Sequence, residues 1–368
     1  MTDVFFATVI VWLLVAMGLA ATVLPFSRIA HGAIRSMEFP RLQIIAVLLA
    51  LIPVGLLVLS GPGRVAALVL IGISLAVQIA NVARFTPVWH SQSVQADAEL
   101  AADKQAQVSV LAANVKMSNR DYGKLVELIR TEQPDIFIGL ETDAPWAESL
   151  RDVAGDFLHR IERPQDNGYG MIVYSRLPMR DIEVRNMVVD GVPSVRAIAE
   201  TRSGLAFRLY AIHPEPPVPN HDSEGRDAEI AVVGMEAKND TLPSLVVGDI
   251  NDVAWSATTR RFQRLSGLLD PRVGRGFYNT FDARYWAFRW PLDHLFHDPE
   301  FRLVDIRRGP FIGSDHFPML FTLALTPHAA AHDTPDHSDP EEQAEAQEMI
   351  HKERRKDRDP IGSDWEDG

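Results

Sequence analysis

Three long apolar stretches open the chain and set it apart from the residues that follow. Residues 4–24, 42–60 and 65–82 contain no charged side chain. At a rise of about 1.5 Å per residue, a helix of each length crosses a hydrocarbon layer roughly 30 Å thick. Three such stretches are not typical of a water-soluble core, and Met1-Thr2-Asp3 lacks the basic start of a cleaved signal peptide. The pattern predicts a membrane anchor over residues 1–85 with three transmembrane helices.

The hydrophobic pattern changes after a polar linker at residues 86–106, which we expect to be flexible. From residue 107 to residue 325, short apolar runs alternate with amphipathic stretches of helical period. This alternation is typical of a mixed α/β domain. The expected strands are residues 108–114, 136–140, 170–174, 195–200, 206–212, 245–248 and 317–323, and the expected helices lie near residues 122–130, 227–237 and 258–265.

Residues 326–368 carry most of the chain's negative charge. This stretch holds thirteen acidic and five basic residues, which gives minus eight of the chain's net minus thirteen. Its few apolar residues cannot offset the entropy cost of ordering, so we predict a solvated, disordered tail with at most a transient helix at residues 341–356. The tail histidines show no fixed metal-ligand spacing, and we assign no metal to them: His328, His332, His337 and His351.

Charge and cysteine content bear on orientation in the membrane. Arg28, Arg35 and Arg41 lie between the first two apolar stretches, and the positive-inside rule would place that connection and the large domain in the cytoplasm. The chain has no cysteine, which suits an oxidising compartment but is also common in cytosolic proteins. Composition therefore leaves the side of the membrane open.

Polar side chains stand where the first predicted strands end. Glu141 follows the apolar run at residues 136–140, and Asn114 ends the strand before it. Oxygen ligands at strand ends suit Mg²⁺, which keeps several waters and bridges to phosphate. Alone, Glu141 would read as an ordinary solvated glutamate; beside Asn114 it becomes a candidate metal ligand.

The segment Gly248-Asp249-Ile250-Asn251 follows another buried run. Because side chains alternate along a strand, Asp249 and Asn251 point the same way. A carboxylate so placed orients or deprotonates an attacking water, and a neutral amide donates to a phosphoryl oxygen as charge builds there. An Asx turn before a helix is the structural alternative.

Two histidines lie next to predicted strands. His213 closes the run at residues 206–212, and His316 stands in Ser314-Asp315-His316 just before the last strand. Asp293 offers a carboxylate that would fix the tautomer of one imidazole and raise its basicity. The remaining histidines of the domain we assign to structural roles, with His294 as the first exception to consider: His159, His221 and His297.

Several other chemistries are excluded by missing motifs. Ser314, Asp315 and His316 do not form a serine-hydrolase triad, because neighbours on an extended segment point to opposite faces and no Gly-x-Ser-x-Gly elbow occurs. The sequence also lacks a Walker loop and an HExxH zinc motif. Oxygen-rich candidate ligands favour Mg²⁺ or Mn²⁺.

Seven segments fall in the order found in one superfamily. The chain resembles the endonuclease/exonuclease/phosphatase superfamily, also called the DNase-I-like fold, over residues 107–325, and its anchor is similar to that of a bacterial membrane-anchored branch. The resemblance implies an α/β (α+β) four-layer α/β/β/α sandwich of two mixed sheets, here preceded by three transmembrane helices. The segments are Asn114, Leu140-Glu141, Gly168 to Ser175, His213-x-Glu215, Gly248-Asp249-Ile250-Asn251, Leu292-Asp293-His294 and Ser314-Asp315-His316.

The resemblance also implies a role for each site residue. Glu141 becomes the principal metal ligand, with Asn114 beside it and Asp315 supporting the metal side. Leu140 and Ile250 replace the family's usual Gln and Phe without removing a functional atom. The other implied roles are water orientation and phosphate contact for Asp249 and Asn251, general base or phosphate-stabilising cation for His316 backed by Asp293, and phosphate binding by the second histidine, His213.

These expectations combine into one function. The chain is predicted to be a multi-pass protein of the bacterial inner membrane, a phosphoesterase that uses Mg²⁺ or Mn²⁺ and a metal-activated water to cleave a lipid phosphate, a diphosphate or a small phosphoester. The resemblance favours an extracytoplasmic domain, and no obligate protein partner is evident. A nuclease acting on DNA or RNA is the alternative, disfavoured because residues 1–325 carry minus five and no basic block. The third hypothesis is a catalytically inactive, membrane-bound binding module.

Overall fold

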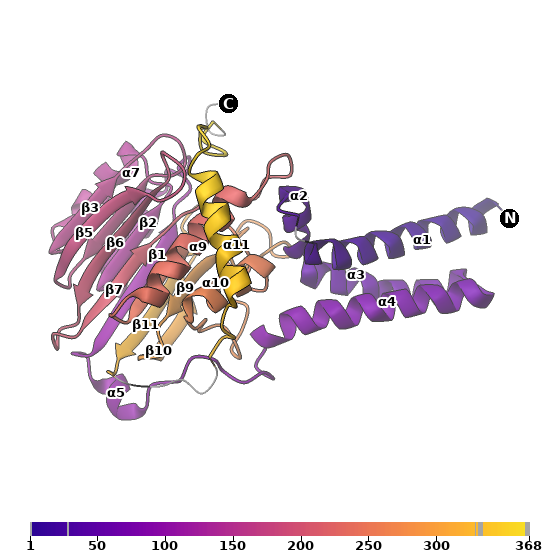
Figure 1. Cartoon of the computed structure of the whole chain (residues 1–368), viewed down its shortest axis with the longest axis horizontal. Coiled ribbons are helices and arrows are strands. Elements are labelled where there is room, and N and C mark those ends of the chain that lie inside the picture. The colour runs from indigo at the N-terminus through magenta and orange to yellow at the C-terminus, as the bar shows by residue number, and fades with distance from the viewer. Residues whose placement is uncertain (1, 28, 328, 330–333, 365–368) are drawn as a thin grey trace.

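Three apolar helices at the N-terminus form a bundle that projects from one side of an α/β domain in the computed structural model (Figure 1). The structure describes residues 2–27, 29–327, 329 and 334–364. The bundle consists of α1 (Thr2–Val23), α3 (Arg41–Val58) and α4 (Gly61–Val82), and the short helix α2 (Gly32–Arg35) lies between α1 and α3. The prediction of three long apolar helices is confirmed.

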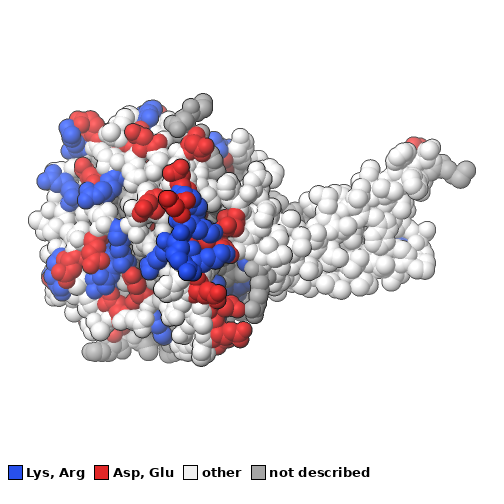
Figure 2. Space-filling view, turned by 45° about the horizontal axis from the view of Figure 1, so that its top comes forward, with Lys and Arg blue, Asp and Glu red and all other residues white. Residues whose placement is uncertain are grey.

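The bundle is apolar inside and outside. Val11, Leu48, Ala67 and Ile71 pack between the helices, while other apolar side chains remain on the outer surface, which is almost free of charge in Figure 2. A helix that is hydrophobic all round suits a lipid environment better than water. By length and composition, three segments can cross a membrane: Thr2–Phe26, Arg41–Val58 and Gly61–Phe85.

The domain contains two mixed β-sheets, as the fold prediction requires. In the first sheet the strand order is β10-β11-β1-β2-β4-β3, and in the second it is β5-β6-β7-β8-β9. Each sheet has one parallel pair, β1 with β2 and β7 with β8, and its other neighbours are antiparallel. The first sheet comprises β1 (Gln107–Asn114), β2 (Ile136–Leu140), β3 (His159–Arg163), β4 (Met171–Ser175), β10 (Phe301–Arg308) and β11 (Met319–Leu325), and the second comprises β5 (Met179–Asn186), β6 (Pro193–Glu200), β7 (Ala206–Ala211), β8 (Ser244–Asp249) and β9 (Asp293–His297).

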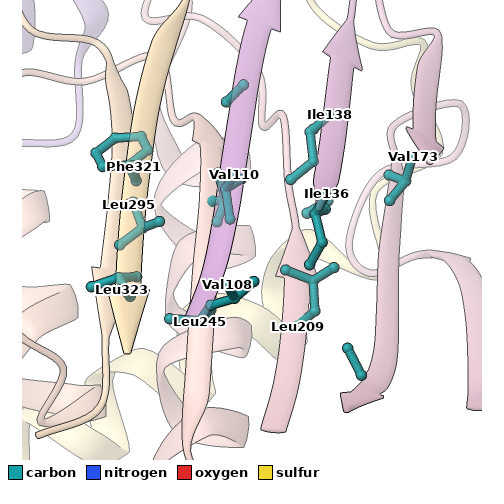
Figure 3. Packing of buried hydrophobic residues seen from close by; sticks show 14 of the residues in the cluster. Val108, Val110, Ile136, Ile138, Val173, Leu209, Leu245, Leu295, Phe321 and Leu323 are labelled. Atoms are coloured by element: carbon teal, nitrogen blue, oxygen red, sulfur yellow. The ribbon is translucent and has the colours of Figure 1, made fainter. Parts of the chain in front are cut away.

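The main core lies between the two sheets. Alternate residues of each strand point inward, so that Val110 and Ile138 of the first sheet face Leu209 and Leu245 of the second (Figure 3). The opposite faces of the strands are also buried, because helices cover both sheets. This explains why the strands read as continuous apolar runs.

Helices form the two outer layers. The first sheet is covered by α6 (Tyr122–Glu132), α7 (Ala144–Ser149) and α8 (Arg151–Ala154), and the second by α9 (Glu224–Asn239), α10 (Ala257–Ser266) and α11 (Pro340–Glu353). Local sequence sets the ends of α10, because the Ser256 side chain accepts a hydrogen bond from the Thr259 amide and Gly267 adopts a φ of 76° at the other end. The four-layer sandwich is confirmed.

The domain contacts the bundle through the connection between α1 and α3. The Trp255 indole donates to the Glu38 carbonyl at 2.7 Å, and the Ala257 amide, at the start of α10, donates to the Glu38 carboxylate at 3.2 Å. Arg41 donates to the same carboxylate at 3.0 Å and to Gln78 of α4 at 2.9 Å. A buried charge requires its partner in a fixed place, so this cluster holds the domain against the bundle.

The prediction of a flexible linker is wrong. Residues 92–96 run along the edge strand β10, where the Leu303 amide donates to the Val94 carbonyl and the Ala96 amide to the Leu303 carbonyl. Ser93 is buried, and its hydroxyl lies 2.6 Å from the His297 imidazole. A short helix, α5 (Ala98–Ala102), then leads into β1. An open sheet edge offers unpaired backbone groups, and this polar segment satisfies them.

The prediction of a disordered tail is wrong for residues 334–364. Helix α11 packs along α9 and buries Ala346 and Ile350 (Figure 1). Asp339 caps its first turn by accepting from the Glu342 amide, and the Glu342 carboxylate pairs with Arg264 of α10. The bases of this segment also pair with the domain, Lys352 with Glu224 and Arg358 with Glu215. Of the tail histidines, His328 and His332 lie outside the described residues.

We expect Ile350→Ala to destabilise the domain by about 2 to 4 kcal/mol, because it leaves a cavity between α11 and α9. The free energy of unfolding in denaturant, measured on the detergent-solubilised chain, checks this. Glu348→Ala on the exposed side of α11 is the control and should change stability by less than about 0.5 kcal/mol. Equal stability of the two variants would contradict the packing of α11.

Candidate active site

Side chains from the ends of several strands meet at one end of the sandwich. Asn114 ends β1 beside Leu140 of β2, and Asp249 of β8 pairs with Asp293 of β9, so the two sheets deliver their polar residues to the same place. They line or underlie a cavity of about 320 Å³. Of the predicted site residues, Glu141, His213, Asn251, Asp315 and His316 line the cavity directly.

The buried floor of the cavity is one connected polar chain. The Asn114 amide lies 2.7 Å from Glu141 Oε1 and 3.1 Å from Asp249 Oδ2, and donates to both. His316 Nε2 lies 3.5 Å from the same oxygen of Asp249, and its Nδ1 is 2.8 Å from Asp293 Oδ2. The structure therefore brings Asn114, Glu141, Asp249, Asp293 and His316 together, as predicted.

The Asp293–His316 pair produces a charged imidazole. Burial of His316 disfavours the charged ring, but the carboxylates of Asp293 and Asp249 outweigh burial and raise the pKa of His316 to about 10. The bond to Asp293 also fixes the tautomer, since Nδ1 must carry a proton. At neutral pH His316 is a held cation that faces the cavity.

Two carboxylates of the site hold protons unusually well. Burial raises the pKa of Glu141 to about 7 and that of Asp249 to about 6, and their mutual repulsion adds to the shift of Glu141. Glu141 keeps 24% of its side chain exposed, so water in the cavity moderates its shift. Buried carboxylates with raised pKa values bind a positive partner, either a proton or a metal ion, rather than remain charged and unpaired.

The donor set fits a hard divalent cation. Asp249, Asp293 and His316 have potential ligand atoms within 4.8 Å of one another, but the protonated His316 ring has no lone pair left for a metal ion. Glu141 and Asn114 adjoin Asp249 and offer further oxygen ligands. Closely spaced carboxylate and amide oxygens bind Mg²⁺ or Mn²⁺ better than they bind a soft metal ion. Glu141 and Asn114 are the residues placed to hold such an ion, with Asp249 beside them.

His213 differs from His316 in its charge. Its Nε2 lies 4.0 Å from both Glu141 Oε1 and Asp249 Oδ2, while its Nδ1 has no hydrogen-bond partner among the described residues. Burial, together with the positive charge of His316, lowers the pKa of His213 to about 3. One neutral and one charged imidazole therefore face the same cavity, so the two rings can act differently on a bound group.

Backbone strain is concentrated around the cavity. Lys116, Glu141 and Asn251 have φ values of 56°, 57° and 52°, in the left-handed region that side chains avoid. Such conformations persist where surrounding structure enforces them, commonly at functional sites. Gly248 has a φ of 153°, and an added Cβ would lie 1.9 Å from the Ile212 carbonyl oxygen. Only glycine lets β8 approach the end of β7 this closely.

The structure engages Asn251 and Asp315 with protein groups. The Asn251 side chain donates to the Pro214 carbonyl at 2.9 Å, which ties the segment after β8 to the segment after β7. Asp315 pairs with Lys116 at 2.9 Å and lies 3.7 Å from Arg284. Asp315 is thus at the cavity wall with two cationic partners, apart from the Asp249, Asp293 and His316 group.

His294 proves to be structural. Its Nε2 contacts the Asp252 carbonyl at 2.9 Å, and its Nδ1 contacts Arg272. Burial and the Arg272 charge hold its pKa well below the ordinary value. Adjacent residues on a strand point to opposite faces, so Asp293 reaches the site and His294 does not.

Sequence reasoning missed several groups that line the cavity. Among them are Lys116, Asn167 with Tyr169, Phe39 from the α1–α3 connection, and Ile361 with Gly362. The place of Lys116 two residues after Asn114, and of Tyr169 in the resembling segment, were available signals. Phe39 and Ile361 had none, because they reach the site only through the tertiary fold.

The C-terminal segment forms one wall of the cavity. Arg358 makes two bonds to the buried Glu215 carboxylate, at 2.6 and 2.7 Å, and the Ile361 amide donates to Glu215 at 2.7 Å. The Tyr169 hydroxyl donates to the Ile361 carbonyl. Glu215, two residues after His213, thus links this wall to the second histidine.

Comparison with known proteins agrees with this geometry. The model of the Endonuclease/Exonuclease/phosphatase family matches residues 111–316. None of the curated proteins matches the chain.

Solved structures share the fold. Humanized D. rerio TDP2 is 17% identical with a TM-score of 0.51, and D. rerio TDP2 complexed with single-strand DNA product is 18% identical with the same TM-score; each comparison covers 59% of this chain and 99% of the other. An endonuclease/exonuclease/phosphatase from Beutenbergia cavernae DSM 12333 is 17% identical, with a TM-score of 0.48 and coverage of 60% and 72%. At these identities the likeness to the two TDP2 structures shows the fold alone.

The raised pKa of Glu141 predicts a pH-dependent stability. The folded state holds this proton more tightly than the unfolded chain, so the contribution is complete below about pH 4.5 and is lost as the pH rises through about 7. In EDTA, the Tm of the natural chain relative to Glu141→Gln should therefore fall across this window. Mg²⁺ should reduce the fall, because the cation replaces the proton.

The control for this experiment is Glu148→Gln, whose carboxylate is exposed. Its Tm should follow that of the natural chain at every pH. If the Glu141→Gln difference were constant from pH 4.5 to pH 7, the raised pKa of Glu141 would be refuted.

Proposed function

The chain belongs to the endonuclease/exonuclease/phosphatase family, and from that premise we propose that it is a membrane-anchored, divalent-metal-dependent phosphoesterase that hydrolyses P–O bonds. One observation carries the proposal: Glu141, Asp249 and His316, far apart in sequence, meet in one cavity with a buried amide between the two acids. This arrangement supplies both a cation site and an imidazolium for the charge of a phosphoryl group.

Each residue of the site has its own role in hydrolysis. Glu141 and Asn114 hold the metal, with Asp315 on the same side, and the bound Mg²⁺ or Mn²⁺ supplies charge stabilisation at a phosphoryl oxygen. Asp249, held by Asn114 and the Asn251 amide, orients the attacking water and accepts its proton.

The imidazoles act on the phosphoryl group. His316, kept protonated by Asp293, stabilises the negative charge that builds on the phosphoryl oxygens. Neutral His213, whose Nε2 lies 4.0 Å from the Asp249 oxygen that His316 also approaches, contacts phosphate as well, and Asn251 adds an amide. In-line attack by water needs no covalent enzyme intermediate.

The position of the cavity supports a lipid phosphate or diphosphate as substrate. Phe39 from the connection between α1 and α3 lines the same cavity as His316. A group entering past Phe39 comes from the side of the domain that contacts the bundle. In Figure 2, basic and acidic side chains are interspersed on the visible face of the domain, without the continuous basic track that a nucleic acid backbone requires.

Two other functions remain defined alternatives. A nuclease is favoured by one observation, the shared fold with a TDP2 that binds a single-strand DNA product. An inactive binding module is disfavoured, because the full set of acids, amide and histidines is present and converges. Plasmid DNA degraded far faster than any lipid phosphate would favour the nuclease.

Substitution of the site should abolish activity. Glu141→Ala and His316→Ala should each lower Mg²⁺-dependent hydrolysis by at least about 10²-fold, because each removes a charge that acts on the transition state. Bis-p-nitrophenyl phosphate, p-nitrophenyl phosphate and a phosphatidic acid report diester, monoester and lipid cleavage in turn. Glu148→Gln is the matched control on the same domain, and full turnover in either site variant would refute the proposal.

We further propose that the protein lies in the bacterial inner membrane with its domain outside the cytoplasm. The resemblance to an anchored branch supports this, while Arg28, Arg35 and Arg41 argue for the opposite side. A phosphatase-type reporter fused after Gly368 should be active, and a fluorescent reporter that matures only in the cytoplasm should be dark. The reverse pattern would place the domain inside.

A further inference from the structure

An exposed aromatic loop lies between the cavity and the helical bundle. Residues 284–289 read Arg-Tyr-Trp-Ala-Phe-Arg. The side chains of Tyr285, Trp286 and Phe288 are 57%, 86% and 55% exposed. Neighbouring large aromatic side chains on a surface indicate an interaction site, because water is a poor environment for them.

The loop is attached to the cavity at one end. The Ala283 amide donates to the Asp315 carbonyl at 2.7 Å, and the Arg284 guanidinium lies 3.7 Å from the Asp315 carboxylate. Phe281 precedes this segment, and Asp315 is bonded to it. Both residues line the cavity. A displacement of the loop would therefore be felt at the cavity wall.

The same loop is attached to the bundle. Gln43, in the first turn of α3, donates to the Ala287 carbonyl at 2.7 Å. At the base of the loop, Trp290 packs edge-on against Phe39 with ring centroids 5.9 Å apart. The loop backbone is thus fixed by the start of α3 at Ala287, while the aromatic side chains on either side of Ala287 remain exposed.

The position of the helical bundle indicates what covers these aromatic side chains. If Arg41–Val58 crosses a bilayer, as the proposed function requires, Gln43 lies within one turn of the membrane boundary. Exposed aromatic side chains also occur at or near the ends of the other two spans: Phe26 ends the first span, and Trp89 lies four residues after the third span ends at Phe85. Tyr and Trp rings concentrate at the boundary between lipid and water, and flanking arginines reach lipid phosphates.

We propose that the tip formed by Tyr285, Trp286 and Phe288 inserts into the interfacial layer of the bilayer beside the anchor. The occupant of this surface is the lipid leaflet itself. Because the loop also contacts the cavity wall at Asp315, insertion holds the catalytic cavity next to the lipid headgroups. The substrate class that follows is a phosphoester presented by the leaflet, a statement that rests on the proposed function.

Because the sequence contains no cysteine, an introduced cysteine can be labelled at one position alone. Trp286→Cys or Phe288→Cys in the full chain carries a single nitroxide label, since the natural sequence offers no other thiol. The labelled protein is placed in nanodiscs of phosphatidylcholine with phosphatidylglycerol. Spin relaxation by oxygen, which partitions into lipid, is compared with relaxation by a water-soluble nickel chelate. Leu158→Cys is the control, 64% exposed and next to β3 on the side of the domain away from the bundle (Figure 1).

Insertion predicts that labels at 286 and 288 are reached by oxygen and shielded from nickel, whereas the label at 158 is reached by nickel. Nickel access at 286 and 288 equal to that at 158 would overturn the proposal. Shielding from both reagents would also overturn it, because it would indicate that protein rather than lipid covers the loop.

An activity measurement tests the link to substrate. A Trp286→Ser, Phe288→Ser double variant should hydrolyse a phosphatidic acid in vesicles about tenfold more slowly, while its hydrolysis of dissolved bis-p-nitrophenyl phosphate stays unchanged. An equal loss on both substrates would show that the loop only supports the fold and would refute presentation by the leaflet. If the natural chain cleaves neither substrate, the proposed function fails, and insertion is judged by the labels alone.

Discussion

Burying two carboxylates beside each other is the constraint on which the site depends. Glu141 and Asp249 share one amide donor, Asn114, inside an otherwise apolar sandwich. Negative charge in such a place is costly unless a positive partner compensates it. The fold supplies one such partner in His316, which Asp293 keeps protonated, and leaves the cavity open for a divalent cation.

The same constraint explains why the backbone is strained here. Glu141 and Asn251 adopt left-handed conformations, and Gly248 permits an approach that no side chain would allow. These conformations turn polar groups from strand ends toward one point, and the helices and sheets around them provide the stability that offsets the strain. Rigidity of the support is therefore part of the chemistry, since hydrolysis depends on groups held in place before the substrate binds.

Segments that precede and follow the sandwich in sequence contribute to the cavity. The connection between α1 and α3 places Phe39 at the cavity, and the C-terminal segment places Ile361 on another wall. Glu38 joins the anchor to α10, while Glu215 joins the C-terminal segment to the region of His213. Anchor, α/β domain and C-terminal segment are consequently joined by buried polar contacts, and each contributes to the lining of the cavity.

The sequence by itself determined the apolar helices, seven of the described strands and the identity of the polar residues at strand ends, because apolar runs are local properties. Strands β3, β5, β9 and β10 were not predicted; they are the edge strands of the two sheets, and the order of strands within each sheet is a tertiary property. Tertiary structure alone decided that His213 is neutral and His316 charged, since each pKa depends on neighbours from distant segments. It also decided that the polar linker and the acidic tail are ordered. Composition counts charges and apolar residues, but only the fold shows that Arg264 pairs with Glu342 and that α9 receives Ile350.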